Sequence, residues 1–151
     1  MSYATIKDIL QYSAHLHQHA SNLYEQLREQ TQRERVDMML VLLSRHEQTL
    51  AASLQSVQEH ANESVLQEWH QFEASSIADV LDNGQNLHPD MSVDELVQIA
   101  LKIDDYLIQL YRQILSEASG KDSQALFQGL ISLEENEKMS TVRAALSAND
   151  W

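Results

Sequence analysis

The sequence predicts one all-α domain, residues 1–151, built as a bundle of four long helices, and three observations lead to this prediction. A chain of 151 residues suits a single domain of ordinary size. Three Gly and one Pro are too few to punctuate a series of short strands and tight turns. Apolar residues recur at helical spacing along four long stretches, which indicates helices that each bury one face.

The first two helices are expected over about 3–29 and 33–60. The apolar stripe of the first begins at Ile6, and that of the second begins at Val36. Only a short polar connection separates the two stretches. We therefore expect these helices to lie side by side and antiparallel.

The segment 61–91 is predicted to be a crossover connection and not a separate domain. Its periodicity is weak, Asn83-Gly84 and His88-Pro89 are turn signals, and two short helices are expected near 65–72 and 77–81. A helix of ~26 residues is ~39 Å long, and a connection of this length can travel that distance. The helix that follows can then run parallel to the second one.

The third and fourth helices are expected over about 92–117 and 122–147. Ser92 and Glu95 form a capping-box pattern, in which each side chain satisfies a free backbone amide at a helix start. Gly120 is expected to cap the C-terminal end of the third helix. The short turn after it makes the last two helices antiparallel neighbours.

Composition and motifs exclude several functional classes. Ten basic and 23 acidic residues give a net charge of −13, which repels nucleic acids and anionic membrane surfaces. The absence of cysteine excludes thiolate metal sites and thiol nucleophiles. No P-loop, Gly-rich dinucleotide motif or Ser/His/Asp arrangement is present, so we expect no organic cofactor. Without a window of ~18 apolar residues we expect no membrane span and place the protein in the cytoplasm.

Polar residues that interrupt the apolar stripes are the candidate functional residues. Each of the four helices contributes at least one ionisable side chain to its inner face near mid-length. The candidates are His17, Glu47, Asp104, Glu134 and Glu137. Buried carboxylates cost several kcal/mol each unless they are neutralised, and no Lys or Arg lies on the stripes at that level. A metal ion, shared protons or water must balance them, and oxygen ligands with imidazole suit Fe, Mn or Zn.

Each of these residues also has a simpler structural interpretation. A single histidine at a helix edge, such as His17 or His46, is more often a hydrogen-bonded flanking residue than a metal ligand. Glu134 and Glu137 alone could belong to a solvated helix face. The remaining histidines lie on polar faces or in the crossover and are expected at the surface; they are His15, His19, His60, His70 and His88.

The spacing of the inward polar residues resembles that of the ferritin-like superfamily, in particular its rubrerythrin-like di-iron carboxylate branch. In that family the first and third helices each supply a Glu about seven residues before a Tyr. The matching pairs in this chain are His17 with Tyr24 and Asp104 with Tyr111.

The second and fourth helices of that family each supply a Glu-x-x-His pair. The matching positions here are Glu47 with Leu50 and Glu134 with Glu137. The resemblance implies a four-helix bundle with one long crossover, a core site for one or two ions of Fe or Mn, and oxygen or peroxide chemistry or iron handling. The alternative is a non-catalytic interaction or stress-related protein with a relict metal site, so whether the protein is an enzyme stays open.

A run of apolar residues from Met38 to Leu43 surrounds the second helix on all sides. Trp69 and Phe72 of the crossover are expected to cover part of this surface. A second copy of the chain would cover the rest, because exposed apolar patches usually mark interfaces. The sequence therefore predicts a homodimer formed through the second helix.

Overall fold

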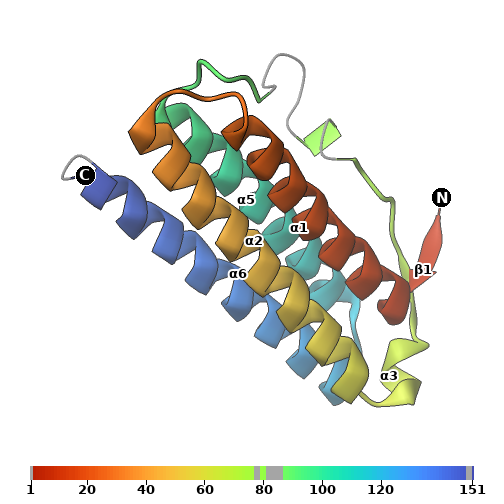
Figure 1. The fold of residues 1–151 in the computed structure, drawn as a ribbon. Helices are drawn as coiled ribbons and strands as arrows, with labels where there is room; N and C mark the ends of the chain where they lie inside the picture. The colour runs from red at the N-terminus through yellow and green to blue at the C-terminus, as the bar shows by residue number, and fades with distance from the viewer. Residues whose placement is uncertain (1, 77–78, 81–86, 149–150) are drawn as a thin grey trace.

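The computed structural model describes residues 2–76, 79–80, 87–148 and 151, and in these residues the chain forms an all-α bundle. Its long helices are α1 (Ile6–Arg28), α2 (Glu34–His60), α5 (Val93–Glu117) and α6 (Lys121–Ser147). Figure 1 shows them packed side by side along most of their length. The predicted fold class is confirmed.

The order of directions in the bundle follows from the lengths of the connections. Figure 1 shows α1 and α2 antiparallel across a short turn, and α5 and α6 antiparallel across another. Figure 1 shows that α5 begins at the opposite end of the bundle from the end of α2, so these two helices run parallel and the connection between them is long. This single long return distinguishes ferritin-like bundles from simple up-and-down bundles.

Side-chain caps fix where two of the helices begin. The Thr5 hydroxyl accepts a hydrogen bond from the Asp8 amide at 3.2 Å, and the Asp8 carboxylate accepts one from the Thr5 amide. Because of this capping box, α1 begins at Ile6 and not at residue 3. The capping box of Ser92 and Glu95 forms as predicted at the start of α5.

Gly120 does not have the role that the sequence suggested. The third long helix ends at Glu117 and its C-terminal cap residue is Ala118. Gly120 instead precedes α6 with extended backbone angles, φ −86° and ψ 147°. Only Ser119 lies between the C-terminal cap residue of α5 and the N-terminal cap residue of α6.

A small two-stranded sheet was not predicted. Strand β1 (Tyr3–Thr5) pairs antiparallel with β2 (Trp69–Gln71), with Ala4 opposite His70. Strands of three residues are too short to show an alternating pattern, and their pairing joins distant parts of the chain. The helix expected near 65–72 is reduced to α3 (Glu63–Leu66), and most of the one expected near 77–81 lies outside the described residues.

The crossover covers the edge between α1 and α5. The ring of Phe72 packs edge-on against Tyr12 of α1 with centroids 5.1 Å apart. The Tyr12 hydroxyl donates to the Ser75 carbonyl oxygen at 2.5 Å and lies 3.1 Å from the hydroxyl of Tyr106 on α5. The expectation that Trp69 and Phe72 cover α2 is therefore wrong, because pairing with β1 holds this segment beside α1.

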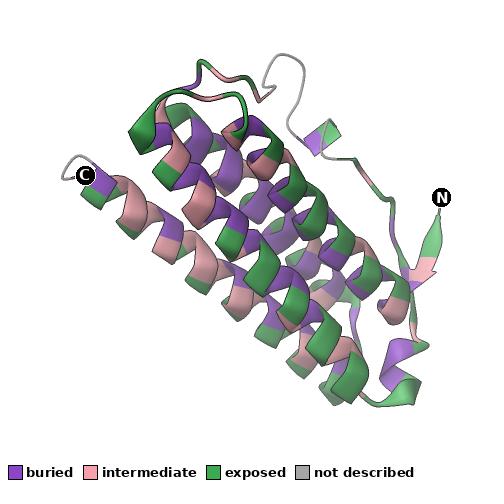
Figure 2. Cartoon of the chain, in the orientation of Figure 1, coloured by how far each residue is buried: buried purple, intermediate pink, exposed green. Residues whose placement is uncertain are grey.

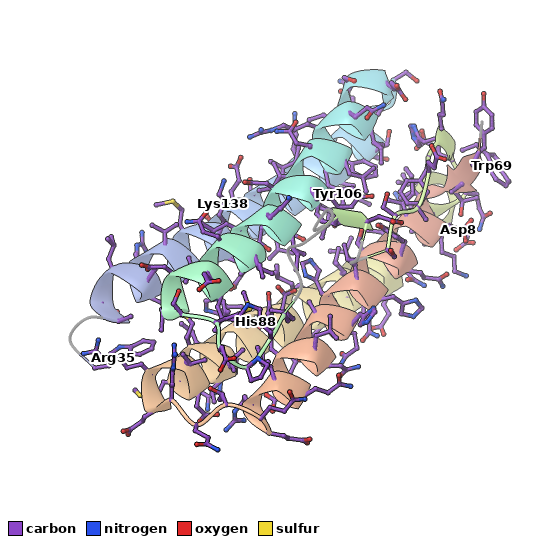
Figure 3. All side chains as sticks on the ribbon, turned by 90° about the horizontal axis from the view of Figure 1, so that it is seen from above. Asp8, Arg35, Trp69, His88, Tyr106 and Lys138 are labelled. Carbon is purple, nitrogen blue, oxygen red and sulfur yellow. The ribbon has the colours of Figure 1, made fainter. Side chains whose placement is uncertain are left out.

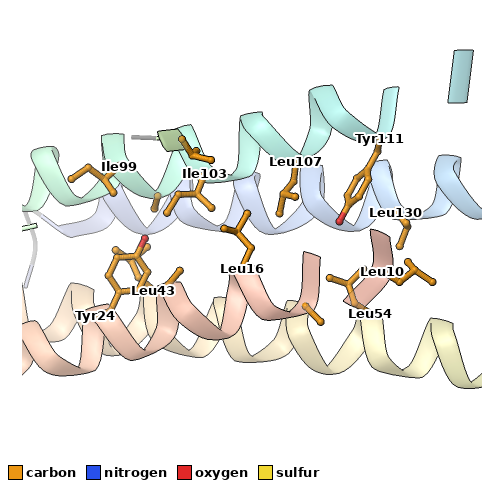
Figure 4. Packing of buried hydrophobic residues seen from close by; sticks show 14 of the residues in the cluster. Leu10, Leu16, Tyr24, Leu43, Leu54, Ile99, Ile103, Leu107, Tyr111 and Leu130 are labelled. Atoms are coloured by element: carbon orange, nitrogen blue, oxygen red, sulfur yellow. The ribbon is translucent and has the colours of Figure 1, made fainter. Parts of the chain in front are cut away.

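The apolar core fills the space between the helices. Figure 2 shows buried residues along the inward faces of the helices and exposed residues on the outward faces. Figure 4 shows Tyr24 of α1 and Tyr111 of α5 reaching inward at different heights, with Leu16 and Leu107 between them. None of the described helices is both long enough and apolar enough to cross a membrane.

Candidate functional site

A layer of ionisable side chains crosses the middle of the bundle, and we call it the polar layer. It consists of His17 from α1, Glu47 from α2, Asp104 from α5 and Glu134 from α6. None of the four residues is more than 3% exposed. Their positions on the apolar stripes direct them inward, since a helix buries the side chains that share its apolar face.

His17 lies at the centre of this layer. Its Nδ1 is 2.5 Å from Oε2 of Glu47, and its Nε2 is 2.6 Å from Oε1 of Glu134. A neutral imidazole has one donor nitrogen and one acceptor nitrogen, whereas the imidazolium donates from both. The contacts with two carboxylates therefore favour the protonated ring, which joins α1, α2 and α6.

The electrostatics agree with this assignment. Burial lowers the pKa of the His17 imidazole, but the charges of Glu134 and Glu47 and the hydrogen bonds to them outweigh that effect, so its pKa lies well above the ordinary value. Burial raises the pKa of Glu47, and the contact with His17 opposes this rise only in part. The proton between these two residues is consequently held tightly in the folded protein.

Asp104 interacts electrostatically with the other carboxylates of the polar layer, but no ion pair of its own is seen among the described residues. Burial, and then the charges of Glu47 and Glu134, raise the pKa of Asp104 well above its ordinary value. This favours the neutral carboxylic acid. In the described part of the chain, Oδ1 of Asp104 and Oε2 of Glu134 are buried without a hydrogen-bond partner.

Tyr24 and Tyr111 flank the polar layer. Burial raises the pKa of both phenols, with further contributions from Glu47 at Tyr24 and from Glu134 at Tyr111. Both hydroxyls are buried, and neither has a hydrogen-bond partner among the described residues. The two phenols therefore stay neutral and add oxygen atoms, but no charge, to the interior.

Glu137 is the one candidate ligand that the structure does not bring into the layer. It is only partly buried, and its carboxylate lies 3.8 Å from Nδ1 of His46. The same His46 nitrogen is 3.1 Å from the Thr141 hydroxyl. Glu137 and His46 thus form a separate contact between α2 and α6 near the surface.

Comparison with known proteins identifies the fold. No protein-family model matches the sequence, and no curated protein matches it. Among solved structures, the chain is similar to a protein from Thermotoga maritima provisionally described as a ferritin-like diiron-carboxylate protein. The fold is ferritin-like. The match covers 98% of this chain and 99% of the other with a TM-score of 0.64, at 16% sequence identity.

The residues of the polar layer do not fit the di-iron centre implied by the rubrerythrin-like resemblance. Leu50, at a position where that pattern has an imidazole, is 1% exposed in the apolar core. Both nitrogens of His17 already face carboxylates, and Glu137 stands apart. Within the described ranges, no three or more His, Asp or Glu side chains are grouped so that they could hold a metal ion.

His70 is a buried residue that sequence reasoning assigned to the surface. It is 8% exposed, and its ring packs edge-on against Phe127 with centroids 6.4 Å apart. It lies in β2 between the exposed residues Trp69 and Gln71. Successive side chains of a strand point to opposite faces, which explains why His70 is buried between two exposed residues. This alternation could be applied only once the strand was known.

Proposed function

We propose that this protein is a non-catalytic ferritin-like bundle that acts through protein–protein contacts, and that its polar layer is a relict of a metal site. The observation that carries the proposal is the incomplete ligand set. The two positions that the resemblance assigns to imidazoles hold Leu50 and Glu137, the first in the apolar core and the second beside His46.

Metal chemistry needs ligands that are free to coordinate and an open position for the substrate. In the polar layer, one oxygen of Glu47 and one of Glu134 are already engaged by His17. A metal ion would have to displace short charge-assisted hydrogen bonds, which are about twice as strong as neutral ones. This supports a structural role for the layer.

The proposed binding surface is the outer face of α2 with the adjoining face of α6. Met38 on α2 is 42% exposed, and on α6 Met139 is 50% and Leu146 75% exposed. The contact between His46 and Thr141 shows that the two helices are neighbours close to Met139. The described part of the crossover leaves Met38 exposed, and we propose that a second copy of the chain covers it.

A second candidate function is the binding of a single Fe or Mn ion, with iron handling or oxygen and peroxide chemistry. The observation in its favour is the pair of buried oxygens without partners, Oδ1 of Asp104 and Oε2 of Glu134. Buried polar atoms of this kind ordinarily have a protein, water or ion partner.

Metal analysis and thermal unfolding separate the two candidates. Protein purified without chelator is expected to hold far less than one metal ion per chain, and added Fe²⁺ or Mn²⁺ should leave its Tm unchanged. A bound ion present at about 100 times its Kd would stabilise the fold by about 2.7 kcal/mol, or roughly 5–11 °C in Tm for a chain of this size. Stoichiometric metal, with a Tm increase that Asp104→Asn abolishes, would contradict the proposed function.

A further inference from the structure

We infer that the protonated imidazole of His17 takes the place of the metal ions in this ferritin-like bundle, as a built-in cation that binds the carboxylates of Glu47 and Glu134 and joins three helices. The inference rests on the proposed function in one respect, because it takes the polar layer to be free of metal. It goes further by naming the group that replaces the metal charge.

The first argument is the charge inventory of the layer. The groups around His17 are Glu47 from α2, Glu134 from α6 and Asp104 from α5. Among the described residues, the buried polar set contains no Lys or Arg. His17 is therefore the only buried side chain of the layer that can carry a positive charge.

The second argument is directional. The two ring nitrogens of an imidazolium point in different directions, so one ring can serve two carboxylates at once. Here they reach the two helices that carry the Glu residues, at 2.5 Å on α2 and 2.6 Å on α6. In the resembled pattern the corresponding position of the first helix holds a Glu, which would add a further negative charge and need a metal to balance it.

The third argument is that an imidazolium in place of metal ions keeps the two buried carboxylates paired. A buried charge pair is strongly destabilised when one partner is removed, because an uncompensated charge remains in the interior. The two carboxylates of the old ligand set are thus retained as partners of His17. A bundle that has lost metal can keep a closed polar layer in this way, with α1, α2 and α6 joined at mid-height.

The direct test is the protonation of His17 in the wild-type protein. Protein with ¹⁵N-labelled histidine would be studied by NMR in the presence of EDTA. Both nitrogens of His17 are expected to carry protons, and to keep them at about pH 8, above the ordinary histidine pKa of about 6.5. A His17 ring with one unprotonated nitrogen at neutral pH would overturn the inference.

Substitutions give an independent test in metal-free buffer. His17→Gln should lower the Tm by roughly 5–15 °C, because it leaves two carboxylates without a cation. The matched control is His15→Gln on the exposed face of the same helix, which should change the Tm little.

A third substitution, Glu134→Gln, is diagnostic through the sign of the change in Tm that it causes. Glu134→Gln should lower the Tm of the wild type, because it removes a partner of His17, but raise the Tm of the His17→Gln variant, because it removes an unpaired charge. If Glu134→Gln raises the Tm of the wild type, His17 does not act as the cation.

The results that would contradict this inference differ from those that would contradict the proposed function. Stoichiometric metal in the wild type contradicts the proposed function. A singly protonated His17 ring in protein stripped of metal contradicts the inference about the built-in cation.

Discussion

His17 differs from the other residues of the polar layer because each of its two ring nitrogens contacts a buried carboxylate. The sequence pattern suggested that carboxylates at this level needed a metal, shared protons or water. The structure adds a fourth answer, a histidine whose two nitrogens contact Glu47 and Glu134. This changes the expected effect of removing the carboxylates. For a relict site with unpaired charges the substitutions would be neutral or stabilising, but paired carboxylates destabilise the fold when they are lost.

The pH dependence of stability should reflect His17 and Asp104. Both have pKa values that are raised in the folded state, above ordinary values of 6.5 and 3.8. The folded protein therefore binds more protons than the unfolded chain, and its stability falls as the pH rises. The loss of stability begins above pH 3.8 for Asp104 and above pH 6.5 for His17. It amounts to at most about 1.4 kcal/mol per pH unit for each proton.

Urea unfolding between mildly acidic and mildly alkaline pH measures this dependence. The wild type is expected to be most stable at the acidic end, and Asp104→Asn should flatten the acidic part of the curve. Stability that increases from pH 6.5 upward would be incompatible with a protonated His17 in the folded protein.

The elements of this fold are fastened by contacts of different strength. The last helix, α6, has few buried residues in its length; they are Ser123, Phe127, Leu130, Glu134 and Thr141. Its exposed ion pairs, Arg112 with Glu135 and Lys138 with Asp105, contribute little because water screens them. Figure 3 shows Lys138 on the outer surface of the bundle. The contact between Glu134 and His17 is therefore a main polar attachment of α6 to α1.

Besides the pairing of β1 with β2, the aromatic residue Tyr12 of α1 holds the crossover at Ser75. The Tyr12 hydroxyl donates to the Ser75 carbonyl oxygen and accepts from the Ser75 amide at 3.3 Å. Tyr12→Phe should cost about 1 kcal/mol, because it leaves these backbone groups unpaired, and should lower the Tm by roughly 2–4 °C. In hydrogen-exchange NMR the Ser75 amide should exchange faster.

The matched control for Tyr12 is Tyr3→Phe, since Tyr3 is 62% exposed. This substitution should leave both the Tm and the Ser75 amide unaffected. Equal effects of the two substitutions would mean that the Tyr12 hydroxyl does not hold the crossover.

At the scale of the whole molecule, the exposed large apolar side chains of α2 and α6 are Met38, Met139 and Leu146. Because Leu42 packs partly against the core, Met38 and Met139 are the better positions for testing the proposed homodimer. Met38→Glu with Met139→Glu should shift the protein from dimer toward monomer in sedimentation at micromolar concentration, without loss of helicity, because both side chains would place charge in the interface.

Trp69→Glu is the control for this prediction. Trp69 is 67% exposed, and Figure 3 shows it at the opposite end of the bundle from Arg35, which lies one turn from Met38. The control should remain dimeric. A wild-type protein that sediments as a monomer under these conditions would rule out the proposed homodimer.

The course of the four long helices follows from the sequence alone, because helical periodicity and capping boxes act over a few residues. The stripes also indicate which polar residues face inward, since the direction of a side chain depends on its position along its own helix. On this basis His17, Glu47, Asp104 and Glu134 could be assigned to the interior, and all four are buried. Glu137 was assigned to the inner face with Glu134 in the same way, but it is only partly buried beside His46 and stands apart from the layer, because a small rotation of the helix in the bundle decides which residues of a stripe are buried.

Only the tertiary structure decided which of these groups meet and which edge the crossover covers. His17 is separated by 30 residues from Glu47 and by 117 from Glu134, so no local pattern shows that one ring contacts both. The pairing of β1 with β2 is similarly distant in sequence, and it places the crossover beside α1 instead of α2. Local spacing determines where each residue points on its helix, but the charge balance of the interior depends on distances between helices, which packing alone sets.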